Sequence, residues 1–320
     1  MQVAQTEELK NLYRRGFEQD SEAYVDYFFR HFATDENTVI YKEEGKIISA
    51  GYIVEKSAFL FGRSCTFPYL TALSTLPEYR GKGKIRFVIE KACDILRKRG
   101  YAYFGLYPFS YSYYTRFGLQ SICYACHSTV IGGQNYTVKG YEEQDFPIVK
   151  AIYDSMSKKF ENRLLSDDKA LKLKLEEYRG DGIECKLLYD QDECFAFAFV
   201  DGGRVDLYAT TDIEKFARAD CLKGCTYFDF FKSDSPYLQG RIIDAKAALF
   251  EYFSYLPPKN KVRLRVIDDM IKGNNICVEI ERIGDKIVIN DCDFAETTYN
   301  IDELTKKIFT DFRNFFPDKY

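Results

Sequence analysis

Apolar and polar positions alternate with two different periods along this chain, and the period changes from one segment to the next. Residues 84–99 carry apolar side chains at helical spacing, which predicts an amphipathic helix that ends at Gly100. The preceding segment, 38–76, predicts strands with a charged turn at residues 43–45, and the aromatic segment 101–109 predicts another strand. Strand, glycine-rich turn, helix and strand in this order predict a βαβ unit, with an anion site at the carboxyl edge of its first strand.

The pattern of predicted elements in residues 1–56 recurs in the middle of the chain. Residues 141–160 predict an acidic start followed by a helix, as residues 1–32 do. Residues 185–203 repeat the strand, acidic turn and strand of residues 38–56. We therefore predict a second, degenerate copy of the first fold, which has no counterpart of the glycine-rich turn.

A different pattern begins near residue 241. It predicts a helix over 241–253, a strand over 261–269, a hairpin that turns at Gly284-Asp285, and a helix over 300–316. The inward-facing residues of that last helix are expected to be Leu304, Ile308, Phe312 and Phe315. The expected fold class is mixed α+β: two sheets flanked by helices, the second degenerate, and a small C-terminal α+β domain. The expected domains are residues 1–130, 131–235 and 236–320.

Composition narrows the classes of function. A net charge of −4 over 320 residues gives no basic field to hold nucleic acid, and the apolar runs are too short to cross a membrane. The polar N-terminus does not read as a signal peptide, and ten cysteines without an export signal are typical of reduced thiols. We therefore expect a cytoplasmic protein with neither a nucleic-acid nor a membrane partner.

Two patterns that suggest metal or histidine chemistry have simpler interpretations. Residues 123–127 spell the C-x-x-C-H pattern of haem attachment, but the stretch reads as a strand. Cys221 and Cys225 have no second pair of ligands nearby, so we expect no metal site. The chain contains two histidines, His31 and His127, and neither stands in the context of a catalytic triad.

The sequence YRGKGKIRF concentrates positive charge and bare backbone on the first turn of the predicted helix. Its glycines let a ligand approach the backbone, and the free N–H groups at a helix start favour a pyrophosphate. The spacing fits neither the Walker A loop nor the dinucleotide fingerprint, and a solvated basic turn is the alternative interpretation. The candidate ligand-binding residues are Arg80, Gly81, Lys82, Gly83, Lys84, Ile85 and Arg86.

The wider segment LSTLPEYRGKGKIRFVIEKACDILRKRG resembles the central motif of the GNAT acetyltransferases, whose loop Q/R-x-x-G-x-G/A binds acetyl-CoA. Ile85 departs from the final Gly/Ala of that loop. The resemblance implies that the backbone of Leu73, Ser74 and Thr75 pairs with the pantetheine arm of the cofactor. Ser110, just past the next predicted strand, is a candidate for a CoA contact by its position.

A second segment, LYPFSYSYYTRFGL, is similar to the Y-x-R-F-G-[YF] signature of the Eis-type (enhanced intracellular survival) acetyltransferases, with Leu119 in place of the last aromatic. That family joins a GNAT domain, a degenerate GNAT domain and a C-terminal domain like sterol carrier proteins. The resemblance implies that Tyr114 is the general acid and that the C-terminal carboxylate, on Tyr320, is the general base. It also implies a homo-oligomer, a hexamer.

The expected function is therefore direct transfer of an acetyl group from acetyl-CoA to a primary amine of a small, cationic acceptor, either aminoglycoside-like or peptidic. A carboxylate that takes a proton from the amine and a hydroxyl that protonates the thiolate require neither a metal nor a covalent intermediate. Two alternatives stay open. One is a non-catalytic protein that binds CoA or a lipid on a GNAT scaffold, and the other is a general protein or peptide N-acetyltransferase in which Tyr320 has no role.

Overall fold

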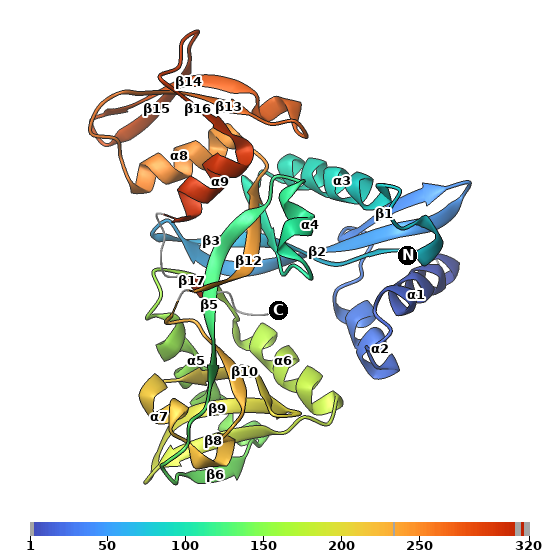
Figure 1. Cartoon of the computed structure of the whole chain (residues 1–320), viewed down its shortest axis with the longest axis vertical. Coiled ribbons are helices and arrows are strands. Elements are labelled where there is room, and N and C mark those ends of the chain that lie inside the picture. Colours follow the sequence, from blue (N-terminus) through green and yellow to red (C-terminus); the bar gives the residue numbers. More distant parts are fainter. Residues whose placement is uncertain (1–2, 233, 311–314, 317–320) are drawn as a thin grey trace. The chain divides into compact units, whose positions relative to one another are not determined.

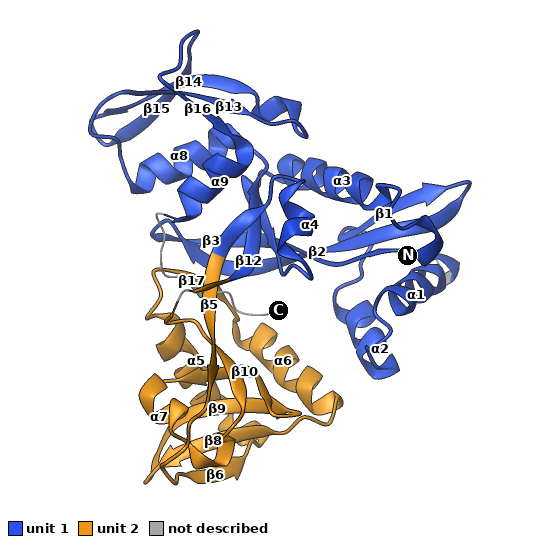
Figure 2. Cartoon of the chain, in the orientation of Figure 1, with its two compact units in different colours: residues 1–122, 236–313 blue, residues 123–235, 314–320 orange. Residues whose placement is uncertain are grey.

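A computed structural model describes residues 3–232, 234–310 and 315–316 of the chain (Figure 1). The chain divides into two compact units (Figure 2). Unit 1 comprises residues 1–122 and 236–313, and unit 2 comprises residues 123–235 and 314–320. Both units combine strands with helices, and a large mixed sheet is accompanied by a second sheet, so the predicted mixed α+β class is confirmed. The three predicted domain ranges stay a prediction.

The larger sheet of unit 1 is built around one parallel pair of strands. Its strands are β1 (Thr38–Glu43), β2 (Lys46–Leu60), β3 (Arg63–Thr75), β4 (Tyr103–Leu106) and β12 (Ser235–Ile242). Neighbours pair antiparallel from β1 to β3 and again from β4 to β12, whereas β3 and β4 run parallel. Helix α3 (Lys84–Lys98) connects β3 to β4, which confirms the predicted βαβ unit.

Helices cover both faces of this sheet. α1 (Val3–Gly16) and α2 (Glu22–His31) share a core cluster with Tyr52 of β2, whereas α3 shares its cluster with Ile53. Because successive strand residues point to opposite faces, α1 and α2 lie on one face and α3 on the other. The apolar stripe of α3 is buried as its spacing predicts, through Ile85, Val88, Ile89, Ala92, Cys93 and Leu96.

The C-terminal part of unit 1 is a four-stranded sheet with two helices. The sheet has the order β15-β14-β13-β16. Its elements are β13 (Val262–Ile267), β14 (Ile276–Ile283), β15 (Lys286–Asp291), β16 (Thr297–Asn300), α8 (Ala245–Tyr255) and α9 (Ile301–Thr310). The hairpin of β14 and β15 turns at Gly284, which has a φ of 62°, and this confirms the predicted turn.

Two boundaries in this part differ from the sequence prediction. The helix expected from residue 241 starts at Ala245, because Arg241 pairs with Phe104 in the sheet and the Asp244 side chain caps the helix at Ala247 N. The last helix does not reach residue 316 either. Phe315 belongs to strand β17 (Phe315–Phe316), which pairs with β7 (Asn162–Leu165), and Phe312 lies outside the residues that the structure describes.

Unit 2 contains a mixed sheet with helices beside it, in which one pair of neighbouring strands runs parallel and the other pairs run antiparallel. Its strand order is β5-β11-β10-β9-β8-β6. The strands are β5 (Gln120–Thr129), β6 (Thr137–Gly140), β8 (Cys185–Asp190), β9 (Glu193–Asp201), β10 (Arg204–Thr210) and β11 (Thr226–Asp229), and the helices are α5 (Phe146–Ser157), α6 (Asp168–Gly180) and α7 (Ile213–Ala217). The C-x-x-C-H stretch lies in β5, as predicted, and all ten cysteines are free thiols.

Candidate active site

A pocket of about 700 Å³ lies in unit 1 beside the carboxyl end of β3. It is lined by the end of α1, residues 73–75, the basic loop with the first turn of α3, and the short helix α4 (Tyr111–Thr115) with its flanking loops. Its volume falls in the range of about 300–1,000 Å³ that small-molecule pockets have. The fold thus brings the basic loop and Tyr114, 28 positions beyond Arg86 in the sequence, to one cavity.

Strand β3 continues past the end of β4 as it approaches this pocket. The two strands pair at Tyr69 and Gly105, and a bulge follows in β3, where Ala72 has a positive φ of 47°. On its other edge β3 stays attached to β2, since the Ser49 hydroxyl donates to the Ser74 carbonyl over 2.8 Å. The end of β3 is therefore held from one side, which suits it to pair with the amides of an extended ligand.

The two glycines of the basic loop are required by backbone conformation. Gly81 and Gly83 have φ values of 75° and 71°. A Cβ atom at either position would meet nothing within 4 Å, so space is not the constraint. Gly83 directly precedes α3, which starts at Lys84 without a side-chain cap, so N–H groups of the first turn can bind an anion.

Arg80 connects the basic loop to the end of β3 and to the end of α1. It follows a short 3-10 helix (Pro77–Tyr79), and its guanidinium donates to the carbonyls of Thr75 over 3.1 Å and Arg15 over 3.0 Å. The end of α1 comes so close to β3 that a Cβ at Gly16 would lie 2.9 Å from the Ser74 Cβ. Arg80 therefore contributes to the architecture of the site as well as to its charge.

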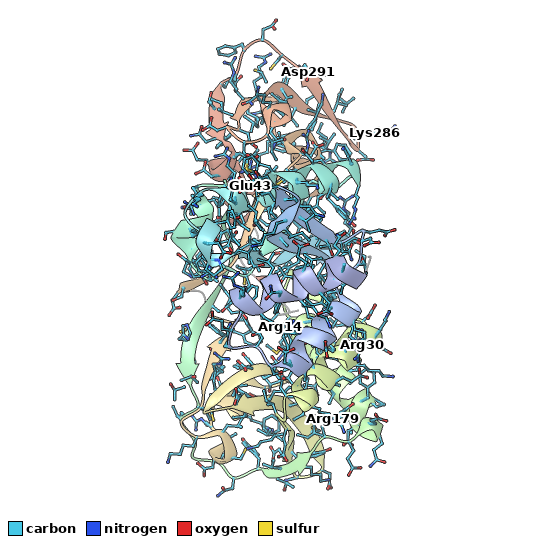
Figure 3. The ribbon with its side chains drawn as sticks, turned by 90° about the vertical axis from the view of Figure 1, so that its right-hand side faces the viewer. Arg14, Arg30, Glu43, Arg179, Lys286 and Asp291 are labelled. Atoms are coloured by element: carbon cyan, nitrogen blue, oxygen red, sulfur yellow. The ribbon has the colours of Figure 1, made fainter. Side chains whose placement is uncertain are left out.

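Two further cations of the loop already have carboxylate partners. Lys84 Nζ lies 2.8 Å from Glu43 Oε1, and this hydrogen bond raises the pKa of Lys84 (Figure 3 labels Glu43). Arg86 Nε lies 2.7 Å from Glu90 Oε1, one helical turn along α3. The positive electrostatic potential at the loop is consequently weaker than the sequence YRGKGKIRF suggests. An incoming anion competes with these two carboxylates for Lys84 and Arg86.

Three of the predicted ligand-binding residues have other surroundings. The ammonium group of Lys82 lies 5.4 Å from the centre of the Tyr79 ring and does not line the pocket. Ser110 precedes α4, has its hydroxyl 3.3 Å from that of Ser112, and does not line the pocket either. Ile85 lines the pocket but is 9% exposed and packs into the core of α3, so its bulk is directed largely into the protein.

Tyr114 lines the pocket through a side chain that is 4% exposed. It packs at right angles against Tyr113 and Phe109, with ring centres 5.1 Å and 5.5 Å away. Within the described part of the chain its hydroxyl has no hydrogen-bond partner. Burial, and to a smaller extent the neighbouring Tyr113, raises the pKa of Tyr114 well above that of a free tyrosine. The hydroxyl therefore keeps its proton at neutral pH and can donate it to a bound group.

Several lining residues were missed by the sequence analysis. Phe17 and Gln19 come from the loop after α1, and Phe109, Tyr113 and Arg116 surround Tyr114. Phe109 is 76% exposed, which is unusual for a phenylalanine, and it contacts the Tyr113 ring with centres 5.0 Å apart. The concentration of aromatic residues at 107–114 could have indicated the lining residues around Tyr114, whereas nothing in the sequence near residues 17–19 points to a ligand.

The pocket contains cations and aromatic rings but no acid. None of its lining residues, all of them in the described ranges, is Asp, Glu or His. Tyr320, the predicted general base, lies outside the residues that the structure describes. Over those same ranges, no group of three or more His, Cys, Asp or Glu could hold a metal ion. No helix that the structure describes has both the length and the apolar character needed to span a membrane.

Comparison with known proteins gives this site a context. Residues 1–122 match the family described as "Acetyltransferase (GNAT) domain". A solved structure from Enterococcus faecalis V583, a conserved protein of unknown function termed a probable N-acyltransferase, has a TM-score of 0.74 and 16% identity, and the match covers 96% of this chain and 87% of that chain. No curated protein matches the chain.

Two other solved structures share the fold. A GCN5-related N-acetyltransferase from Anabaena variabilis ATCC 29413 has a TM-score of 0.67 and 15% identity, over 95% of this chain and 87% of that one. Eis1 from Mycobacterium abscessus has a TM-score of 0.68 and 11% identity, over 97% and 88%. Residues 1–122 thus carry a GNAT acetyltransferase domain, a type that uses acetyl-CoA or another acyl-CoA, and the enzyme class that this domain supports is N-acetyltransferase.

Proposed function

We propose that this protein transfers an acetyl group from acetyl-CoA to the primary amine of a small acceptor by direct attack in a ternary complex. The observation that carries the proposal is the position of Tyr114. Its protonated hydroxyl, which has no hydrogen-bond partner among the residues that the structure describes, belongs to a side chain that lines the same pocket as the glycine loop at the start of α3. A phosphate-binding loop and a proton donor in one cavity are what acetyl transfer from CoA requires.

The cofactor is proposed to lie along the elements described above. Its pyrophosphate binds the N–H groups around Gly81, Gly83 and the first turn of α3, with Arg80, Lys84 and Arg86 around it. The pantetheine amides pair with the backbone of residues 73–75, where β3 extends beyond the end of β4. This path directs the thioester toward α4 and Tyr114. Lys82 and Ser110 are proposed to act at most from outside the pocket.

The reaction follows from these positions. The neutral amine attacks the thioester carbonyl carbon, the C–S bond breaks, and the departing thiolate takes the proton of Tyr114. The raised pKa of Tyr114 keeps that proton in place before the reaction, but it also makes Tyr114 a weaker acid than free tyrosine. Each unit of pKa difference costs about 1.4 kcal/mol in full transfer, so the hydroxyl acts first as a hydrogen-bond donor to the developing negative charge.

The base that removes the amine proton is proposed to be the carboxylate of Tyr320. Support comes from the composition of the pocket, since the lining residues among those described offer no Asp, Glu or His for the task. A small cationic acceptor, aminoglycoside-like or peptidic, fits such a carboxylate. It also fits the aromatic wall of Phe109 and Tyr113, because a cation binds favourably over an aromatic face.

The remaining features of the proposal come from the resemblance to Eis-type proteins. They are a cytoplasmic location, assembly into a homo-oligomer, a hexamer by resemblance, and a sterol-carrier-like fold for residues 236–320. A lipid-binding role for that last segment has little support. A pocket between α8, α9 and the adjacent sheet holds about 50 Å³, far below the roughly 300 Å³ at which ligand pockets begin.

The test compares two neighbouring tyrosines of the same pocket. Purified protein is incubated with acetyl-CoA and a panel of primary amines, and acetylated product is measured by mass spectrometry. We expect Tyr114→Phe to lower kcat by roughly 100-fold or more while acetyl-CoA affinity is kept, since general acids contribute about 10²–10⁴-fold. Tyr113→Phe, the matched control, should keep kcat. Full activity of Tyr114→Phe would refute the assignment, and wild-type protein that binds acetyl-CoA without transfer would favour the non-catalytic alternative.

A further inference from the structure

We propose that Arg241, buried in β12 and not itself part of the pocket lining, is a positioning residue that holds Tyr114 in place for acetyl transfer. The guanidinium of Arg241 links the turn after α4 to a carboxylate in the C-terminal part of unit 1. The inference rests on the proposed function, because Arg241 would act only through Tyr114. It assigns a role in the reaction to a residue more than a hundred positions away in the sequence.

The first observation is the contact between Arg241 and the turn after α4. Arg241 Nη1 donates to the carbonyl of Phe117. Gly118 follows with a φ of 74°, and a Cβ at that position would lie 1.8 Å from the same nitrogen. The guanidinium therefore lies directly against the turn, and glycine is required there both by conformation and by the closeness of Arg241.

The second observation is the way in which Arg241 itself is held. Its side chain is 1% exposed, and Nη2 lies 2.8 Å and 2.7 Å from the two carboxylate oxygens of Asp268. That carboxylate also accepts hydrogen bonds from the N–H groups of Met270 and Ile271 and from the side chain of Asn274. Asp268 is thus fixed by its own loop, and it provides a rigid anchor for the guanidinium.

The third observation is that β12 holds both ends of α4. Gln239, two residues before Arg241 and on the same face of the strand, donates to the Tyr111 carbonyl over 3.1 Å at the start of the helix. Arg241 holds the Phe117 carbonyl at its end. Tyr114 stands between these two attachments, and its own carbonyl accepts from Phe117 N over 3.0 Å. A five-residue helix is marginal in isolation, so its orientation depends on such attachments.

The free-energy cost of burying the Arg241–Asp268 ion pair indicates that Arg241 serves to position the turn after α4 rather than to stabilise the fold. Burying a guanidinium is costly, and Arg241 Nε has no hydrogen-bond partner among the described residues. Replacing a buried ion pair by well-packed apolar side chains is often neutral or stabilising, so a buried pair is weak evidence for a role in stability. What an apolar side chain could not do is donate a hydrogen bond to the Phe117 carbonyl, which fixes the turn beside Tyr114.

The anchoring is tested first by hydrogen exchange, which needs no activity. Arg241→Lys keeps a cation for Asp268 but cannot keep the same planar contact with Phe117. Peptides covering residues 111–119 should exchange roughly tenfold faster in this variant, while those of α3 are unchanged. Ile280→Val, a conservative core change in β14, is the control and should leave residues 111–119 unaffected. Unchanged exchange in Arg241→Lys would overturn the inference, and Asp268→Asn serves as the second variant if Arg241→Lys does not fold.

The link to Tyr114 is tested by a double-mutant cycle on kcat. Arg241→Lys should lower kcat by about tenfold with the acetyl-CoA dissociation constant within about twofold. In the Tyr114→Phe background the same change should lower the residual rate by less than about twofold, because the group that it positions is gone. Equal effects in both backgrounds would overturn the positioning role. Absence of transfer by wild-type protein would refute the proposed function instead, and the exchange result would still decide whether Arg241 anchors α4.

Discussion

Gly118 offers a direct test of how tightly the turn beside Tyr114 is packed. Gly118→Ala places a methyl group in a left-handed conformation, which costs about 1–2 kcal/mol for a residue other than glycine. The same methyl group would lie 1.8 Å from Arg241 Nη1 and 3.0 Å from Ile301 Cγ2. The guanidinium must then release the Phe117 carbonyl, at a cost of about 1.5–3 kcal/mol for a hydrogen bond from a charged group. The expected total is roughly 2.5–5 kcal/mol in the free energy of unfolding.

Gly83→Ala is the matched control for this substitution. Gly83 has a φ of 71°, close to the 74° of Gly118, but nothing lies within 4 Å of its Cβ position. It should therefore lose only the conformational term, about 1–2 kcal/mol. Urea unfolding followed by circular dichroism compares the midpoints of the two variants and checks that the slopes are unchanged. Equal losses would refute the close packing of Arg241 against the turn.

Three further predictions concern the pocket itself. Glu43→Gln removes the carboxylate 2.8 Å from Lys84 Nζ, so acetyl-CoA affinity measured by calorimetry should rise about two- to fivefold, most at low salt, and a loss of affinity would contradict this. Because burial raises the pKa of Tyr114, its hydroxyl stays protonated below about pH 10, so kcat/KM should rise between about pH 7 and 9 with the neutral fraction of the amine, and with the same profile in Tyr114→Phe; a fall in the wild type that disappears in Tyr114→Phe would contradict the raised pKa. Phe109→Ala, at an exposed side chain, should raise the KM for the acceptor severalfold with an unchanged melting temperature, whereas an unchanged KM would remove Phe109 from the acceptor site.

The features predicted correctly from the sequence are those encoded within short segments. Helical spacing in residues 84–98, the glycines before it and the aromatic strand after it are local patterns, and the βαβ unit follows from them. The role of Tyr114 as general acid, which the resemblance of one short motif implied, stays a prediction, and the structure adds that Tyr114 lines the same pocket as the loop. The boundary near residue 241 was mistaken because the apolar run there continues from a strand into a helix, and only pairing with Phe104 separates the two.

The features that were missed depend on contacts between distant parts of the chain. Glu43 weakens the positive charge of the basic loop from 41 residues away, and no spacing rule predicts that pair. Arg241 reaches the Phe117 carbonyl from 124 residues away. Gly118 could be recognised as part of a motif, but its reason, a guanidinium packed against the turn, becomes evident only when β12 lies beside β4. Long-range packing, and not local propensity, determines these parts of the site.

Binding of acetyl-CoA at the glycine loop is the most direct test of the proposed function. Calorimetric titration of acetyl-CoA into wild-type protein is compared with the double variant Arg80→Ala/Gly83→Asp. Aspartate tolerates the left-handed conformation better than most residues, so this variant should fold while its carboxylate repels the pyrophosphate. We predict a dissociation constant on the order of micromolar for the wild type and a loss of at least about 100-fold in the variant. No binding to the wild type, or equal binding to both proteins, would contradict the placement of the cofactor at this loop.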